Sequence, residues 1–304
     1  MIVPPYLKKG DKIGLVCTAR KISLTELDFA LKVLHSWGLE VVLGKSIGQT
    51  QHQFAGSDAV RIADFQSMLD NPDIKAILCA RGGYGTVRLI DHLDFSGLPK
   101  QAKWIIGYSD ITVLCSHVHQ NFDLCSLHAT MPISFSGNTE AALQSLQQAL
   151  FGKNLSYTFA ADIHNRQGRA KASVVGGNLS LLYSLLGSSS GIDTAGKMLF
   201  LEDLDEYLYH IDRMMMNLKR NGLLHNLAGL LVGGMTDMND NTTPFGKTAI
   251  EIIQEHTQDF TYPVAFNFPA GHWADNRAII IGAEASLVVG ETEVVFKQDV
   301  TLAI

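Results

Sequence analysis

The fold is decided by residues 12–43, which read KIGLVCTARKISLTELDFALKVLHSWGLEVVL. Residues 12–18 have the pattern of an apolar β-strand, residues 23–37 that of an amphipathic helix, and residues 39–43 that of a second strand. Ser23 and Glu26 stand three residues apart, which predicts a capping box at the start of the helix. A strand, a helix and a strand in this order predict a βαβ unit with parallel strands.

The same alternation continues to about residue 120. Further strands are expected at residues 76–80 and 104–108, and further helices at residues 57–69, 86–92 and 111–120. Successive βαβ units predict an α/β fold with a mostly parallel sheet that helices cover on both faces.

A polar stretch without a clear period, residues 151–170, predicts a linker. We therefore expect a first domain at residues 1–150 and a second α/β domain at residues 171–304. In the second domain, strand and helix patterns alternate again, and two short strand patterns end the chain. The expected strands are 173–175, 198–201, 230–232, 264–268 and 278–281, and the expected helices are 179–186, 207–221 and 247–255.

Composition excludes several classes of protein. The 304 residues carry a net charge of −6, which argues against a large basic surface for nucleic acid. No run of about 18 apolar residues exists that could span a membrane, and the first residues lack the core of a signal peptide. The four cysteines form no CxxC pair, and three of them stand in apolar runs, which predicts buried, reduced thiols. We expect a soluble, cytoplasmic protein.

The first candidate for chemistry is Ser109, in the motif Gly107-Tyr108-Ser109-Asp110 between a predicted strand and a predicted helix. A serine at such a turn lies at the carboxyl edge of the sheet, where open α/β folds bind their ligands. The N–H groups that open the helix can stabilise an oxyanion. The motif is similar to a nucleophile elbow, although Ile111 stands in the place of the second glycine. Alternatively, Ser109 only caps the helix.

A glycine-rich turn, Arg81-Gly82-Gly83-Tyr84-Gly85, follows the preceding strand of the sheet. Its spacing matches neither a dinucleotide-binding fingerprint nor a P-loop. Two interpretations remain open: a tight turn, or a turn whose amides contribute to an oxyanion hole beside Ser109.

Four acidic residues within positions 202–206 follow another strand, and His272 follows Gly271 on a loop after a further strand. The acidic residues form a solvated loop, a metal site or a catalytic carboxylate. We expect no metal, because the nearest His-x-His pair points to different faces of a helix. A serine, an acid and a histidine are the three groups of a catalytic triad, although their spacing does not show that they meet.

Six short motifs, taken in order, resemble the LD-carboxypeptidase family, the serine peptidases of the S66 type. Each motif alone is weak, but six in the family's order are specific. They span residues 80–272 and are Arg81-Gly82-Gly83-Tyr84-Gly85, Gly107-Tyr108-Ser109-Asp110, Gly176-Gly177-Asn178-Leu179, Leu201-Glu202-Asp203 with Glu206, Ile211-Asp212-Arg213-Met214, and Gly271-His272.

The resemblance implies a flavodoxin-like N-terminal domain that carries the serine and a C-terminal swivelling domain that carries the acid and the base. Ser109 is then the nucleophile, His272 the general base and later acid, and Glu202 the residue that orients His272. The backbone N–H groups of Gly83 and Asp110 are implied to form the oxyanion hole. No cofactor is implied.

The resemblance also implies a substrate, a murein tetrapeptide from which the terminal D-alanine is removed after the L-centre of a diamino acid. Because this substrate ends in a carboxylate, a cationic anchor is expected, with Arg81 and Arg213 as candidates and Asn178 as a further contact. Glu206 competes with Glu202 for the acid role, but only Glu202 follows the strand directly. A homodimer that binds a small peptide, and neither nucleic acid nor membrane, is expected.

Three alternatives compete with this function. Peptidases that inactivate microcin C-type antibiotics share the triad motifs but tend to be longer. A ligand-binding α/β module needs Ser109 only as a helix cap, and a serine-directed covalent probe tests this alternative. A metal-dependent hydrolase loses activity with a chelator.

Overall fold

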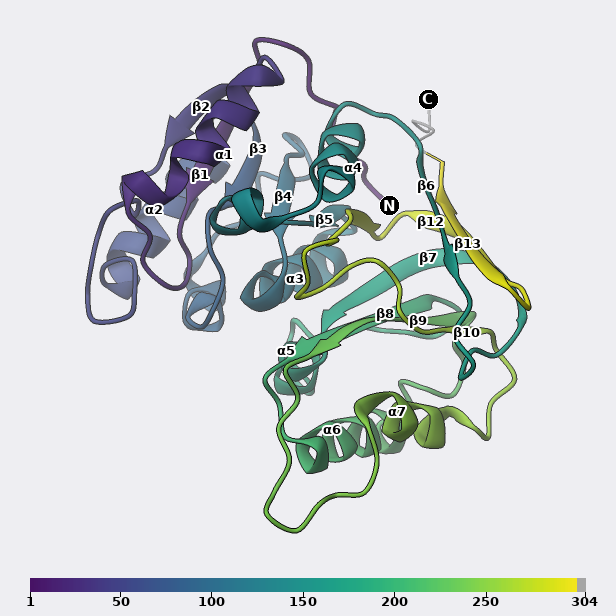
Figure 1. Ribbon diagram of the computed structural model, residues 1–304. Helices are drawn as coiled ribbons and strands as arrows, with labels where there is room; N and C mark the ends of the chain where they lie inside the picture. Colours follow the sequence, from purple (N-terminus) through teal and green to yellow (C-terminus); the bar gives the residue numbers. More distant parts are fainter. Residues whose placement is uncertain (300–304) are drawn as a thin grey trace.

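The computed structural model describes residues 1–299, which form two β-sheets with helices around them (Figure 1). The first sheet has the strand order β11-β5-β4-β3-β1-β2, in which β1 to β5 are parallel. This order is that of flavodoxin-like folds. The strands are β1 (Lys12–Val16), β2 (Glu40–Leu43), β3 (Ile74–Cys79), β4 (Trp104–Gly107), β5 (Ser126–His128) and β11 (Ile279–Ile281).

Helices cover both faces of the first sheet, as the βαβ pattern predicts. Buried side chains of α1 and α4 belong to the core on one face, and those of α2 and α3 to the core on the other. The predicted capping box is present, since Ser23 and Glu26 exchange hydrogen bonds at the start of α1. The expected helix at residues 86–92 consists of two short 3₁₀ turns, Thr86–Arg88 and Ile90–His92. The helices are α1 (Leu24–Ser36), α2 (Asp58–Asp70), α3 (Thr112–Phe122) and α4 (Glu140–Leu150).

The second sheet has the order β10-β9-β8-β7-β12-β13-β6, and its first four strands are parallel. Helices α6 (Leu208–Arg220) and α7 (Ala249–Thr257) cover the face turned away from the first sheet, and α5 (Leu179–Ser184) lies beside α3 (Figure 1). Among residues 1–299, no helix has the length and apolar character to cross a membrane. The strands are β6 (Leu155–Ala160), β7 (Gly168–Asn178), β8 (Met198–Leu204), β9 (Gly229–Thr236), β10 (Val264–Ala265), β12 (Glu284–Val289) and β13 (Glu293–Gln298).

Two segments differ from their expected places. The stretch expected as a linker, residues 151–170, contains β6 and the start of β7. In β6, buried Leu155 and Tyr157 alternate with exposed polar residues, and this short alternation was hidden by the polar composition. The strand at residues 279–281, expected in the second domain, pairs antiparallel with β5 of the first sheet. An all-buried isoleucine run predicts a strand but does not identify its partner.

The two sheets share one hydrophobic core. Trp104 and Leu127 of the first sheet belong to the same cluster of buried side chains as Phe200 and Leu231 of the second. As a result, the strands that carry the candidate residues end close together.

Close to these strand ends, the Oγ1 of Thr112 accepts the N–H of Asn178 at 3.1 Å. Gly177 lies against Thr112 so closely that a Cβ there would stand 2.6 Å from this oxygen, and its φ of +149° also favours glycine. The start of α3 and the end of β7 are therefore held in direct contact.

Candidate active site

Ser109 lies at a sharp turn between β4 and α3. Its φ is +61°, a left-handed conformation that non-glycine residues adopt rarely and that concentrates at functional sites. Ile111 fills the space behind the turn, because a Cβ at Gly107 would stand 2.7 Å from its Cγ1. The helix-start positions here are Tyr108 and Ile111, and neither makes a side-chain cap bond. Ser109 thus has the backbone of a nucleophile elbow.

The glycine-rich turn lies directly against this serine. A Cβ at Gly82 would stand 3.2 Å from the Cβ of Ser109 and 3.4 Å from its Oγ. The carboxylate of Asp110 joins the two turns, since its Oδ2 accepts the N–H of Thr86 at 2.9 Å. Burial raises the pKa of Asp110 above its usual value. The two segments that carry the expected oxyanion-hole residues, Gly83 and Asp110, therefore meet at Ser109.

Glu202 and His272 form a buried pair. The Oε2 of Glu202 lies 2.6 Å from the Nδ1 of His272, and the Glu202 side chain is fully buried. Gly271, with a φ of +113°, lets the loop approach, because a Cβ there would stand 2.8 Å from the Cβ of Glu202. The expected orienting acid and base are thus joined by a hydrogen bond, while Glu206 instead binds His210 at 2.6 Å.

Each partner favours the charged form of the other. Burial works against the charge on Glu202, but the facing His272 outweighs it, so the pKa of Glu202 lies below its usual value. Burial likewise opposes the charge on His272, but the carboxylate of Glu202 outweighs it and raises the pKa of His272. A histidine that accepts a proton readily, beside a carboxylate that stabilises the resulting charge, is suited to general-base chemistry.

The ring of Tyr108, the residue before Ser109, packs against His272 at a centroid distance of 4.7 Å. This contact brings the histidine to the strand end that carries the serine. A hollow of about 400 Å³ opens beside the pair, and its lining also includes Ser134, Asn138 and Trp273. His272 and Tyr108, the neighbour of Ser109, therefore both line this hollow.

The side chain of Asn178 makes two hydrogen bonds inside the protein. Its side-chain N–H donates to Oδ1 of Asp203 at 2.9 Å, and its side-chain Oδ1 accepts the N–H of Leu181 at the start of α5. Burial, together with the neighbouring Glu202, raises the pKa of Asp203 to about 7. The side chain of Asn178 is therefore engaged inside the protein.

The two expected cationic anchors, Arg81 and Arg213, lie in different parts of the structure. Arg81 follows β3, donates to the carbonyl of Lys21 and stands 3.9 Å from the carboxylate of Glu26. Arg213 lies on α6 with its guanidinium 5.1 Å from the ring of Tyr209, and it lines a different hollow from His272.

A third cation, Arg20, was not identified from the sequence. Its side chain lies over the glycine-rich turn, where a Cβ at Gly83 would stand 2.6 Å from its Cδ. No motif surrounds this residue, so only the three-dimensional contact between the turn and the loop after β1 reveals it.

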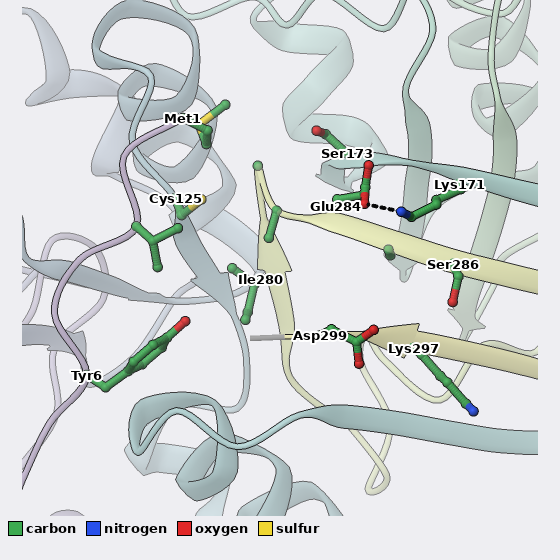
Figure 2. Close-up of a pocket in the computed structure, with 14 residues that line it drawn as sticks. Met1, Tyr6, Cys125, Lys171, Ser173, Ile280, Glu284, Ser286, Lys297 and Asp299 are labelled. Atoms are coloured by element: carbon green, nitrogen blue, oxygen red, sulfur yellow. Dashed lines mark ion pairs between the residues drawn. The ribbon is translucent and has the colours of Figure 1, made fainter. Parts of the chain in front are cut away.

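A further hollow, of about 470 Å³, lies between the N-terminal segment and strands β7, β12 and β13 (Figure 2). Its ion pair, Lys171 with Glu284 at 2.9 Å, is largely exposed, and none of the expected site residues lines it. Elsewhere in residues 1–299, no three His, Cys, Asp or Glu side chains come together as a metal site would require.

Two family models match the chain. The family model of the LD-carboxypeptidase N-terminal domain matches residues 13–129, and that of the C-terminal domain matches residues 171–287. A protein of Bacillus subtilis described as a probable murein peptide carboxypeptidase is 35% identical, with 98% of this chain and 95% of that protein covered.

Two solved structures share the fold. One is a muramoyltetrapeptide carboxypeptidase from Oxalobacter formigenes, with a TM-score of 0.86 and 24% identity over 94% of this chain and 98% of that one. The other is the microcin C7 self-immunity protein MccF, with a TM-score of 0.88 and 20% identity over 99% and 100%. The fold and the matches together define the chain as a serine carboxypeptidase of α/β architecture. It belongs to the LD-carboxypeptidase family, as its six motifs indicate.

Proposed function

We propose that this carboxypeptidase hydrolyses the bond between the L-centre of a diamino acid and the terminal D-alanine of a murein tetrapeptide. The observation that carries the proposal is the buried 2.6 Å bond between Glu202 and His272, and the packing of His272 against Tyr108 supports it. The name of the relative at 35% identity supports a murein peptide as substrate. The likeness to MccF is one of fold, so inactivation of a microcin C-type antibiotic is the weaker alternative.

In this mechanism, the Oγ of Ser109 attacks the carbonyl carbon of the scissile bond while Nε2 of His272 takes its proton. Glu202 accepts the Nδ1–H of His272 and stabilises its positive charge. The N–H groups of Gly83 and Asp110 bind the oxyanion. His272 then gives its proton to the nitrogen of the departing D-alanine. A water molecule, deprotonated by His272, then attacks the acyl carbon. The bond from this carbon to Oγ of Ser109 breaks, His272 returns its proton to Oγ, and the tripeptide is released with a free carboxylate.

The departing D-alanine carries a free carboxylate, which needs a cationic partner. We assign this role to Arg81, because it begins the glycine-rich turn that contacts Ser109. Asn178 is engaged with Asp203, and Arg213 lines another hollow, so neither supports a contact with the end of the tetrapeptide.

The proposed setting is a cytoplasmic homodimer, with the boundary between the two domains at residues 151–154, between α4 and β6. All four cysteines are free and buried, which fits a reducing compartment. Light scattering during gel filtration measures the oligomeric state, and a monomer at micromolar concentration contradicts the dimer.

The activity is tested by incubating the protein with lysine-type and diaminopimelate-type tetrapeptides and measuring D-alanine by mass spectrometry. Release is expected for the wild type and not for Ser109→Ala. A serine-directed covalent probe should label the wild type and leave Ser109→Ala unlabelled. If neither tetrapeptide releases D-alanine, the proposed substrate is wrong; if the probe labels both proteins equally, the nucleophile is wrong.

A further inference from the structure

A second histidine lies buried behind the candidate triad. His128, on β5, is 2% exposed, and its Nε2 has no hydrogen-bond partner among residues 1–299. The Oε1 of Glu202 is also buried and, within the same described residues, also lacks a partner. Buried polar atoms without partners are uncommon in native proteins and call for an explanation. Of these two unpartnered atoms, Nε2 of His128 can donate a hydrogen bond and Oε1 of Glu202 can accept one.

A chain of contacts places the two atoms in one cluster. The ring of His128 packs 4.8 Å from that of Phe200, which lies two residues before Glu202 on β8. Because side chains alternate along a strand, Phe200 and Glu202 point to the same face of the sheet. On its other side, His128 lies 5.9 Å from the ring of Tyr108, which in turn packs against His272. His128 is therefore enclosed by the residues around the pair of Glu202 and His272.

His128 is in the right state to donate a hydrogen bond. Burial lowers its pKa to about 4, although the nearby Glu202 acts in the opposite direction. The ring is therefore neutral near pH 7 and carries one N–H, on either nitrogen. The tautomer with the proton on Nε2 satisfies the otherwise unpartnered nitrogen.

We propose that His128 is a positioning residue of the active site, whose Nε2–H supplies, directly or through one water, the hydrogen bond that Oε1 of Glu202 lacks. The inference rests on the proposed function, because it assigns His128 a role in orienting the acid of the triad. A carboxylate bonded only at Oε2 can rotate about its last torsion angle. A donor at Oε1 fixes the carboxylate plane toward Nδ1 of His272, as supporting partners do for other reactive groups.

The test compares two substitutions at this position. His128→Phe keeps an aromatic ring but removes the donor, and we expect kcat to fall about 10- to 150-fold, the range for losing a hydrogen bond to a charged group. KM should stay within about twofold, since His128 does not touch the substrate. His128→Gln places an amide N–H near the position of Nε2 and should restore most of kcat. Should His128→Phe fail to fold, His128→Met takes its place as the apolar variant.

His119→Phe is the matched control. His119 is 5% exposed, and its Nδ1 likewise lacks a partner within residues 1–299, but it lies on α3 beside Gly282 rather than beside Glu202. Its kcat should equal that of the wild type. A kcat of His128→Phe within twofold of the wild type overturns the inference, and so does an equal loss in His128→Phe and His128→Gln. Failure of the wild type to release D-alanine would instead refute the proposed function.

Discussion

Glu202→Gln removes one charge from the buried pair with His272 while keeping the shape of the side chain. The carboxylate is fully buried and 2.6 Å from Nδ1 of His272, so water cannot replace it. Removing one partner of a buried ion pair costs about 3–5 kcal/mol. If that cost falls on the charged imidazolium of the transition state, kcat drops about 150- to 5,000-fold. A glutamine amide also favours the wrong tautomer of the imidazole.

The assay is the rate of D-alanine release from a murein tetrapeptide at saturating substrate, with Glu206→Gln as the control. The carboxylate of Glu206 pairs with His210 rather than with His272. Glu206→Gln should change kcat less than about threefold, a value typical of a partly exposed pair. If Glu206→Gln is the more damaging change, or if Glu202→Gln raises KM and leaves kcat unchanged, the assignment of the acid is wrong.

Three further outcomes are expected. The pKa of His272 is raised above its ordinary value of 6.5, and the reaction needs the neutral imidazole. As a result, kcat/KM should fall toward low pH with an apparent pKa above 6.5, and a pH–rate profile measures this fall. Gly271→Ala should lower both kcat and the melting temperature, because a left-handed φ costs about 1–3 kcal/mol and the new Cβ meets Glu202. Dialysis against a chelator should leave D-alanine release unchanged, since the proposed chemistry uses only groups of the protein and water; loss of activity that a divalent metal restores would contradict this.

Local patterns in the sequence predict much of the fold. The capping box of Ser23 and Glu26 is present as expected, and the parallel strands of the first sheet follow from successive βαβ units. Pairing between distant segments is different. The isoleucine run of β11 is equally compatible with either sheet, and only the packed structure shows that it joins β5. β6 pairs with β13, more than 130 residues later, and its few buried positions are too short a signal to identify it.

The candidate site likewise has features that local sequence predicts and features that only the folded chain shows. The special position of Ser109 can be predicted, because a strand, a glycine and a helix start surround it within a few residues. The choice between Glu202 and Glu206 depends on which carboxylate reaches His272, and only the folded chain determines that. His128 stands in the short strand β5, where nothing in the local sequence distinguishes it from an ordinary core residue. Its importance comes from a contact with β8, about 70 residues away.

The serine and the carboxylate that orients its base come from different sheets. The distance between the serine and its base therefore depends on the contact between those sheets. The turn fixes the backbone of Ser109 locally, but the distance from its Oγ to His272 depends on how β4 and β8 lie relative to each other. Residues with no side chain make the required approach possible. A Cβ at Gly176 would stand 2.0 Å from the carbonyl oxygen of Phe200, and one at Gly177 would meet Thr112. Gly176 therefore sets how closely β7 and β8 approach within the sheet that carries Glu202, and Gly177 sets how closely that sheet approaches the helix that follows Ser109. Both glycines act on the chemistry without touching substrate.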